Sequence, residues 1–108
     1  MKRKRIVEAE EFRLVDSDHN LRLRISTWPT DGQPLIQLFD TNSLPRISIS
    51  VAGENAYVTL LHSDGNASVG LFMREDGQIG INICRENGEK VFFAGVDING
   101  ETVVQAAT

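Results

Sequence analysis

The stretch "FRLVDSDHNLRLRI", residues 12–25, consists of two short alternating apolar segments joined by a polar bend. If residues 17–20 form the loop, Leu14 lies opposite Leu23 and Phe12 lies opposite Ile25. Alternate residues of a strand point to the same face, so all four side chains would share one face. The stretch therefore predicts an amphipathic β-hairpin.

Three further segments align with this stretch without a gap. They are "IQLFDTNSLPRISI" from Ile36, "VTLLHSDGNASVGL" from Val58 and "INICRENGEKVFFA" from Ile81, at spacings of 24, 22 and 23 residues. A fifth copy begins at Val104. The same register gives only apolar pairs in each copy: Leu38–Ile47, Ile36–Ile49, Leu60–Val69, Val58–Leu71, Ile83–Phe92 and Ile81–Ala94. A slip of one residue would turn each set to the other face, so the agreement supports both the hairpins and the register.

The connections between these copies also have the composition of turns. They are "PTDG" at 29–32, "AGEN" at 52–55, "EDG" at 75–77 and "ING" at 98–100. The last two suit three-residue loops that end in a left-handed glycine. No stretch keeps a helical period of 3.6. We therefore predict an all-β fold, an antiparallel meander of about four β-hairpin repeats with a period of about 23 residues.

An apolar sheet face must be covered, and no helix is expected to cover it. The sheet could close into a barrel, fold over as a sandwich, or pack against copies of itself in a prism-like or stacked assembly. In the second half of the chain the other face is apolar as well, which favours a subunit interface there. The predicted interface residues are Phe72, Val91 and Phe93, and we expect a homo-oligomer.

With 108 residues and 41% apolar composition, the chain suits one domain. We place a basic N-terminal arm and lead-in at 1–9 and a single β-hairpin-repeat domain at 10–108. The longest apolar runs are too short for a membrane span or a secretory signal. The single cysteine, Cys84, excludes an internal disulfide and suits a reducing compartment. We therefore expect a cytoplasmic protein with no membrane partner.

The net charge of −4 hides an uneven distribution. The arm sequence "KRKR", residues 2–5, contributes +4, and the remainder carries −8. An acidic body repels phosphate backbones, so we do not expect a nucleic-acid partner.

The first two copies resemble a hairpin repeat of small uncharacterised bacterial proteins, many of them from mobile gene pools such as integron cassettes. That repeat has a pattern near "FxLxDxxGxxRxxI", and the resemblance covers about residues 10–98. The matching residues are Phe12, Leu14, Asp16, Arg22 and Ile25 in the first copy, and Ile36, Leu38, Asp40, Arg46 and Ile49 in the second. The third and fourth copies lack both the Asp and the Arg. The resemblance implies a β-repeat architecture and self-association, and it transfers no catalytic residue.

Few residues suggest a catalytic or metal-binding role. The bend "DSDHN", residues 16–20, places oxygen ligands as a calcium loop does, but Leu21 replaces the required glycine and Thr27 the bidentate glutamate. Turn formation explains this bend and its three counterparts, so we expect no metal site and no cofactor. His19 and His62 lie on bends and are the nearest candidates for acid–base work. No nucleophile motif accompanies them, so we assign no catalytic residue.

Two sets of residues could bind a partner. Arg13 lies opposite Arg24, and with Arg22 and Arg46 these arginines form a cationic cluster that needs an acidic neighbour or a bound anion. Trp28 and Tyr57 lie near the loops between copies; they could line a pocket mouth if the sheet closed into a barrel, but capping of the core is the favoured role.

The sequence favours a non-catalytic binding or structural module that self-associates and presents a β-surface to a partner. Two alternatives stay open: a small-ligand-binding β-barrel, and a small enzyme whose site is assembled between subunits.

Overall fold

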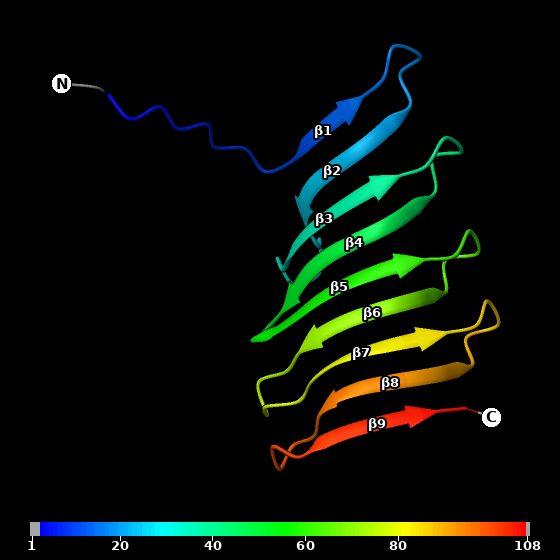
Figure 1. Ribbon diagram of the computed structural model, residues 1–108. Helices are drawn as coiled ribbons and strands as arrows, with labels where there is room; N and C mark the ends of the chain where they lie inside the picture. The colour runs from blue at the N-terminus through cyan, green and yellow to red at the C-terminus, as the bar shows by residue number, and fades with distance from the viewer. Residues whose placement is uncertain (1–2, 108) are drawn as a thin grey trace.

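The fold is a single antiparallel sheet of nine strands in the order β1 to β9, so every strand pairs with its neighbours in sequence (Figure 1). The computed structural model describes residues 3–107. The strands are β1 Phe12–Val15, β2 Leu21–Thr27, β3 Pro34–Phe39, β4 Pro45–Ala52, β5 Asn55–Leu61, β6 Ala67–Met73, β7 Ile79–Cys84, β8 Lys90–Val96 and β9 Thr102–Ala106. Over residues 3–107 the chain has no helix of the length and apolarity that crossing a membrane would require. The all-β prediction is confirmed.

The predicted register is confirmed in every hairpin. Leu14 pairs with Leu23, and the corresponding apolar pairs follow in each later hairpin. Pairing also continues between hairpins, as in Leu71 with Ile81 and Ala94 with Val104. One side of the sheet, here called the apolar face, carries Phe12, Leu14, Leu23, Ile25, Ile36, Leu38, Ile47, Ile49, Val51, Val58, Leu60, Val69, Leu71, Met73, Ile79, Ile81, Ile83, Phe92, Ala94 and Val104.

The other side, here called the mixed face, combines cationic, polar, aromatic and glycine positions. Its members include Arg13, Arg22, Arg24, Leu35, Gln37, Arg46, Ser48, Ser50, Tyr57, Thr59, Gly70, Phe72, Gly80, Asn82, Phe93, Gly95 and Gln105. The two faces follow directly from the two-residue period of a strand.

The hairpin bends differ in one respect from the predicted four-residue loops. In the first bend, the Asp16 N–H donates to the Asn20 carbonyl and the His19 N–H donates to the Asp16 carbonyl. This is a three-residue loop, 17–19, followed by a bulge that shifts the pairing between Leu14 and Val15. The extra residue in the bulge compensates for the shorter loop. Beyond the bulge, the strands therefore pair in the predicted register.

The third loop residue takes a left-handed conformation in each of these four bends. It is His19 at φ 63°, Ser43 at 61°, Gly65 at 90° and Gly88 at 89°. The connections ending at Gly77 and Gly100 close in the same way, as predicted for them.

Side chains in the loops or at a strand end bond to the backbone of the next hairpin. The Gln33 Oε1 accepts the Gly53 N–H at 3.1 Å, and the Asn55 Oδ1 accepts the Glu75 N–H at 2.9 Å. Asn66 Nδ2 donates to the Glu86 carbonyl at 3.2 Å. These bonds link loops 20 residues apart, so they hold successive hairpins in line at both ends of the strands.

The sheet is open, with β1 and β9 as free edges (Figure 1). The single chain is therefore neither a barrel nor a sandwich, and its apolar face has no covering layer. Among residues 3–107, the only buried hydrophobic side chain is Leu35, which is 2% exposed. Residues 3–11 contain no strand and run away from the sheet (Figure 1).

The dimensions agree with an uncovered sheet. The chain exposes 8266 Å², whereas a folded monomer of its mass exposes about 6,000 Å². Its radius of gyration is 17.2 Å, against about 13 Å for a compact domain of this length. The extended arm accounts for part of the difference, and the uncovered sheet accounts for the rest.

Candidate functional site: the two faces of an open sheet

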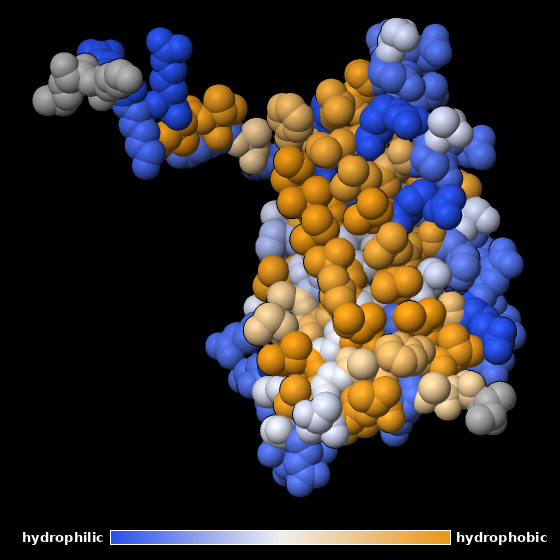
Figure 2. Space-filling view, in the orientation of Figure 1, coloured by the Kyte–Doolittle hydropathy of each residue, from blue (hydrophilic) through white to orange (hydrophobic). Residues whose placement is uncertain are grey.

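Large apolar side chains cover the apolar face and remain exposed to solvent (Figure 2). Exposures range from 37% at Leu38 to 67% at Val104. The exposed members are Phe12, Leu14, Ile25, Leu38, Ile49, Val51, Leu60, Leu71, Met73, Ile79, Ile81, Ile83 and Val104. Polar and charged residues form the rim of this surface in Figure 2. A continuous apolar surface with a polar rim is typical of a binding interface.

The twist of the sheet makes part of the apolar face concave. A hollow of about 730 Å³ lies over β4 to β9, with Ile49, Val58, Leu71, Ile81 and Val104 among its lining residues. Its lining is almost entirely apolar, so it can accept hydrocarbon groups.

The four arginines predicted as an anion or partner site all belong to the mixed face, but each has a different environment. Arg13 pairs with Glu11 at 2.6 Å, so an acidic residue just before β1 neutralises it. Arg24 donates from Nη2 to the Gln37 Oε1 at 2.6 Å, while its buried Nε has no acceptor. Arg22 is half-buried and, within residues 3–107, forms no ion pair.

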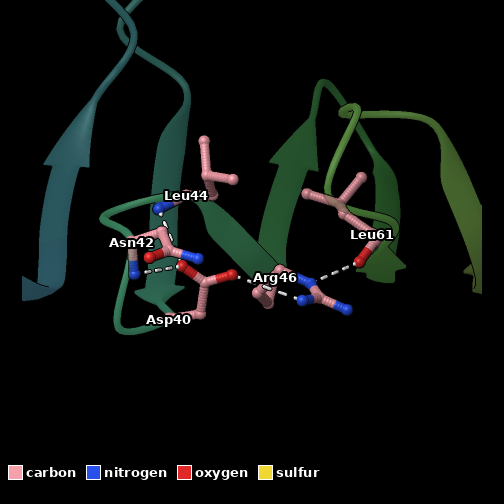
Figure 3. Close-up of polar contacts among 5 residues, drawn as sticks. All are labelled: Asp40, Asn42, Leu44, Arg46 and Leu61. Atoms are coloured by element: carbon pink, nitrogen blue, oxygen red, sulfur yellow. Dashed lines mark hydrogen bonds and ion pairs between the residues drawn. The ribbon is translucent and has the colours of Figure 1, made fainter.

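Arg46 acts as a link between hairpins. Its Nη1 lies 3.3 Å from Asp40 Oδ2, and its Nε donates to the Leu61 carbonyl at 2.8 Å (Figure 3). The same Asp40 carboxylate accepts the backbone N–H groups of Asn42 and Leu44 (Figure 3). Arg46 therefore has a structural role that joins the second bend to β5.

Charge is segregated between the strands and their connections. None of the 15 acidic residues lies in a strand, whereas Arg13, Arg22, Arg24, Arg46 and Lys90 all do. All of the acids lie in the arm, bends and loops. The negative charges therefore lie in the arm and at the two ends of the strands, and the mixed face is locally cationic. This segregation is not visible in the net charge of the chain, because it depends on where each strand begins and ends.

The Asp16 carboxylate has the turn-forming role predicted for it. Its Oδ1 accepts the N–H groups of Asp18 and Asn20, at 2.9 and 3.0 Å. No group of three or more His, Cys, Asp or Glu side chains that could hold a metal ion occurs in residues 3–107.

These bend bonds make stability sensitive to acid. The N–H groups of Leu44 and Asn20 hold the pKa values of Asp40 and Asp16, respectively, below the usual range. A carboxyl whose pKa is lower in the folded state stabilises the fold above its unfolded pKa, and this contribution is lost as pH falls through the folded pKa. We expect the melting temperature to fall below about pH 4.

The Asp16→Asn/Asp40→Asn double variant is the control for that titration, because Asn keeps an acceptor oxygen and cannot titrate. Its melting temperature should start lower and decline less between neutral and acid pH. Circular dichroism measures both melting temperatures. An equal decline between neutral and acid pH in the two proteins would contradict the stabilising role of the two carboxylates.

The histidines do not form a catalytic pair. His19 lies exposed on the first bend, and His62 begins the third bend, half-buried, with no partner for its Nε2. Neither donates to or accepts from a carboxylate within residues 3–107. Cys84 is a half-buried free thiol on the mixed face beside Lys90.

The aromatic residues predicted as pocket-mouth or interface residues lie in two separate places. Trp28, 44% exposed, lies in the loop after β2, and Tyr57 lies on β5; only Tyr57 borders the apolar hollow. Phe72 and Phe93 do come together, with ring centroids 6.1 Å apart and planes at 21°. Val91 is half-buried on the same strand as Phe93.

Comparison with protein-family models gave no match, and comparison with curated proteins gave none at a significant level.

Proposed function

We propose that this protein is a non-catalytic β-sheet module that self-associates through its apolar face and presents its mixed face to a partner. The observation that carries the proposal is the exposure of large apolar side chains across one whole face, with Leu35 as the one buried apolar residue within 3–107. Isolated sheets with an exposed apolar face are not stable in water, because hydrophobic burial supplies most of the folding free energy.

The uncovered surface is large enough to bind a second copy of the chain. One chain exposes about 2,300 Å² more than a compact monomer of its mass, part of it from the extended arm, and a stable protein interface buries about 800 Å² on each partner. Sheets that pack face to face interdigitate inward-facing side chains at about 10 Å, and the apolar face supplies such side chains along all nine strands. Phe72, Val91 and Phe93, the interface predicted from sequence, lie on the other face and would stay accessible in this arrangement.

The proposal predicts a mass of at least twice 12.0 kDa by sedimentation or light scattering. It also predicts a melting temperature that rises with protein concentration, because association and folding are linked. A protein of 12.0 kDa whose melting temperature is independent of concentration would contradict self-association.

The apolar hollow supports a second candidate function, the binding of an apolar small molecule. Its volume of about 730 Å³ lies within the range of ligand pockets. The two functions differ in whether the apolar face is accessible to solvent. An apolar face covered by a second copy excludes the dye anilinonaphthalene sulfonate, whereas the open apolar face of a monomeric carrier binds it. Strong dye fluorescence from a monomeric, cooperatively folded sample would favour the carrier.

A further inference from the structure

The mixed face has a second hollow, of about 350 Å³, over β6 to β9. Phe72 and Phe93 contribute much of its apolar surface. Gly80 lies between the two phenylalanines, and a Cβ added there would come within 2.6 Å of Phe93 Cε2. The ring of Phe93 therefore lies directly over a strand that has no side chain at that point.

Two cations lie next to the aromatic rings. The Arg74 guanidinium carbon is 5.1 Å from the Phe72 centroid, and Lys90 Nζ is 5.8 Å from the Phe93 centroid. Contacts of this kind orient the cations without neutralising them. Neither cation forms an ion pair with another residue of the 3–107 range.

The nearby acid, Asp97, forms no ion pair with either cation. Asp97 also lines the hollow, but its Oδ1 accepts the N–H groups of Asn99 and Glu101, at 2.9 and 3.0 Å. The arrangement thus keeps two positive charges available beside an aromatic surface, which suits a ligand that is both flat and anionic.

A buried hydrogen-bond acceptor indicates a third property of the ligand. The Oδ1 of Asn82, which also lines the hollow, is buried and has no donor. A buried polar atom without a partner carries a free-energy cost that a ligand donor would remove. A ligand with a hydroxyl or amino group opposite its anionic group would satisfy it.

We infer that this hollow binds a small aromatic carboxylate that carries a hydroxyl or amino donor. Phe72 and Phe93 contact the ring of the ligand, Arg74 or Lys90 pairs with its carboxylate, and Asn82 accepts from its donor. The volume of about 350 Å³ admits one such ring system, at the lower end of the range for ligand pockets. The site lies on the face opposite the proposed subunit interface, so it does not depend on self-association.

The test titrates the full-length protein with 4-hydroxybenzoate, followed by heteronuclear NMR. We expect saturable shifts at Asn82, Phe72 and Phe93, with a Kd of about 1 mM or below. Benzoate lacks the donor and 4-hydroxybenzamide lacks the charge, so each should bind several-fold more weakly. The mass of each sample is measured in parallel, which separates a failure of binding from a failure of association.

The double variant Arg74→Gln/Lys90→Gln should weaken 4-hydroxybenzoate binding by about tenfold or more, because both charges are lost. Arg85→Gln is the matched control, since Arg85 pairs with Glu89 on an exposed bend and lines neither hollow. The inference is overturned by an absence of shifts at about 10 mM probe, by shifts confined to the apolar face, or by equal affinity in the double variant.

Discussion

Replacing Leu60 with glutamate is expected to abolish self-association. Leu60 lies on β5, the central strand, and is 42% exposed on the apolar face. An ionised carboxylate inside an apolar interface costs several kcal/mol, and we expect a loss of at least about 100-fold in association affinity, or about 3 kcal/mol. Sedimentation should show 12.0 kDa monomer, or a marked drop in melting temperature if the monomer cannot fold alone.

The neighbouring variant Thr59→Glu is the matched control. Thr59 lies on the same strand and points to the mixed face, where its partner on β6 is Gly70, which leaves room for a longer side chain. Both variants add one negative charge and lower the β-propensity of one position. Thr59→Glu should keep the mass of the wild type. If Leu60→Glu also keeps that mass, the apolar face is not the interface.

Replacing Gly95 with alanine is expected to disrupt the pairing of β7 with β8. A Cβ at this position would collide with the Ile79 carbonyl oxygen and come within 2.7 Å of Gly80 Cα. Both atoms belong to the paired strand's backbone, which cannot move without breaking the ladder. We expect a loss of about 3 kcal/mol or more in the free energy of unfolding, at the upper end of overpacking effects.

Gly70→Ala is the control for this prediction. Gly70 is also a strand glycine of the mixed face, but nothing lies within 4 Å of a Cβ placed there. Its change should leave stability nearly unaltered or raise it slightly, since alanine loses less backbone entropy on folding. Chemical denaturation of both variants measures the difference, and equal stabilities would contradict the close approach at Gly95.

The strand register was predictable because apolar residues alternate on both sides of each bend. Pairs such as Leu14 with Leu23 and Ile81 with Ala94 follow from the period of two together with a constant loop length. The details of the bend were not predictable. A four-residue loop, and a three-residue loop with a bulge, both place Leu23 opposite Leu14; they differ at Leu21, which pairs with Val15 in the structure.

The cationic and aromatic sites were predictable only in part. Alternation placed Arg13 opposite Arg24 and put Phe72 and Phe93 on one face. It could not place the Arg74 guanidinium over Phe72, or join Arg46 to Asp40 and the Leu61 carbonyl, because side-chain direction at a strand end depends on local twist.

Hairpins with one apolar and one mixed face follow from the order of the residues alone, because side-chain alternation is a local property of each strand. The open state of the sheet is visible only in the folded chain. Closure depends on the twist and shear accumulated over nine strands and on the space between the end strands, which no single hairpin encodes. Because β1 and β9 do not meet, the apolar face remains uncovered and becomes the surface to test.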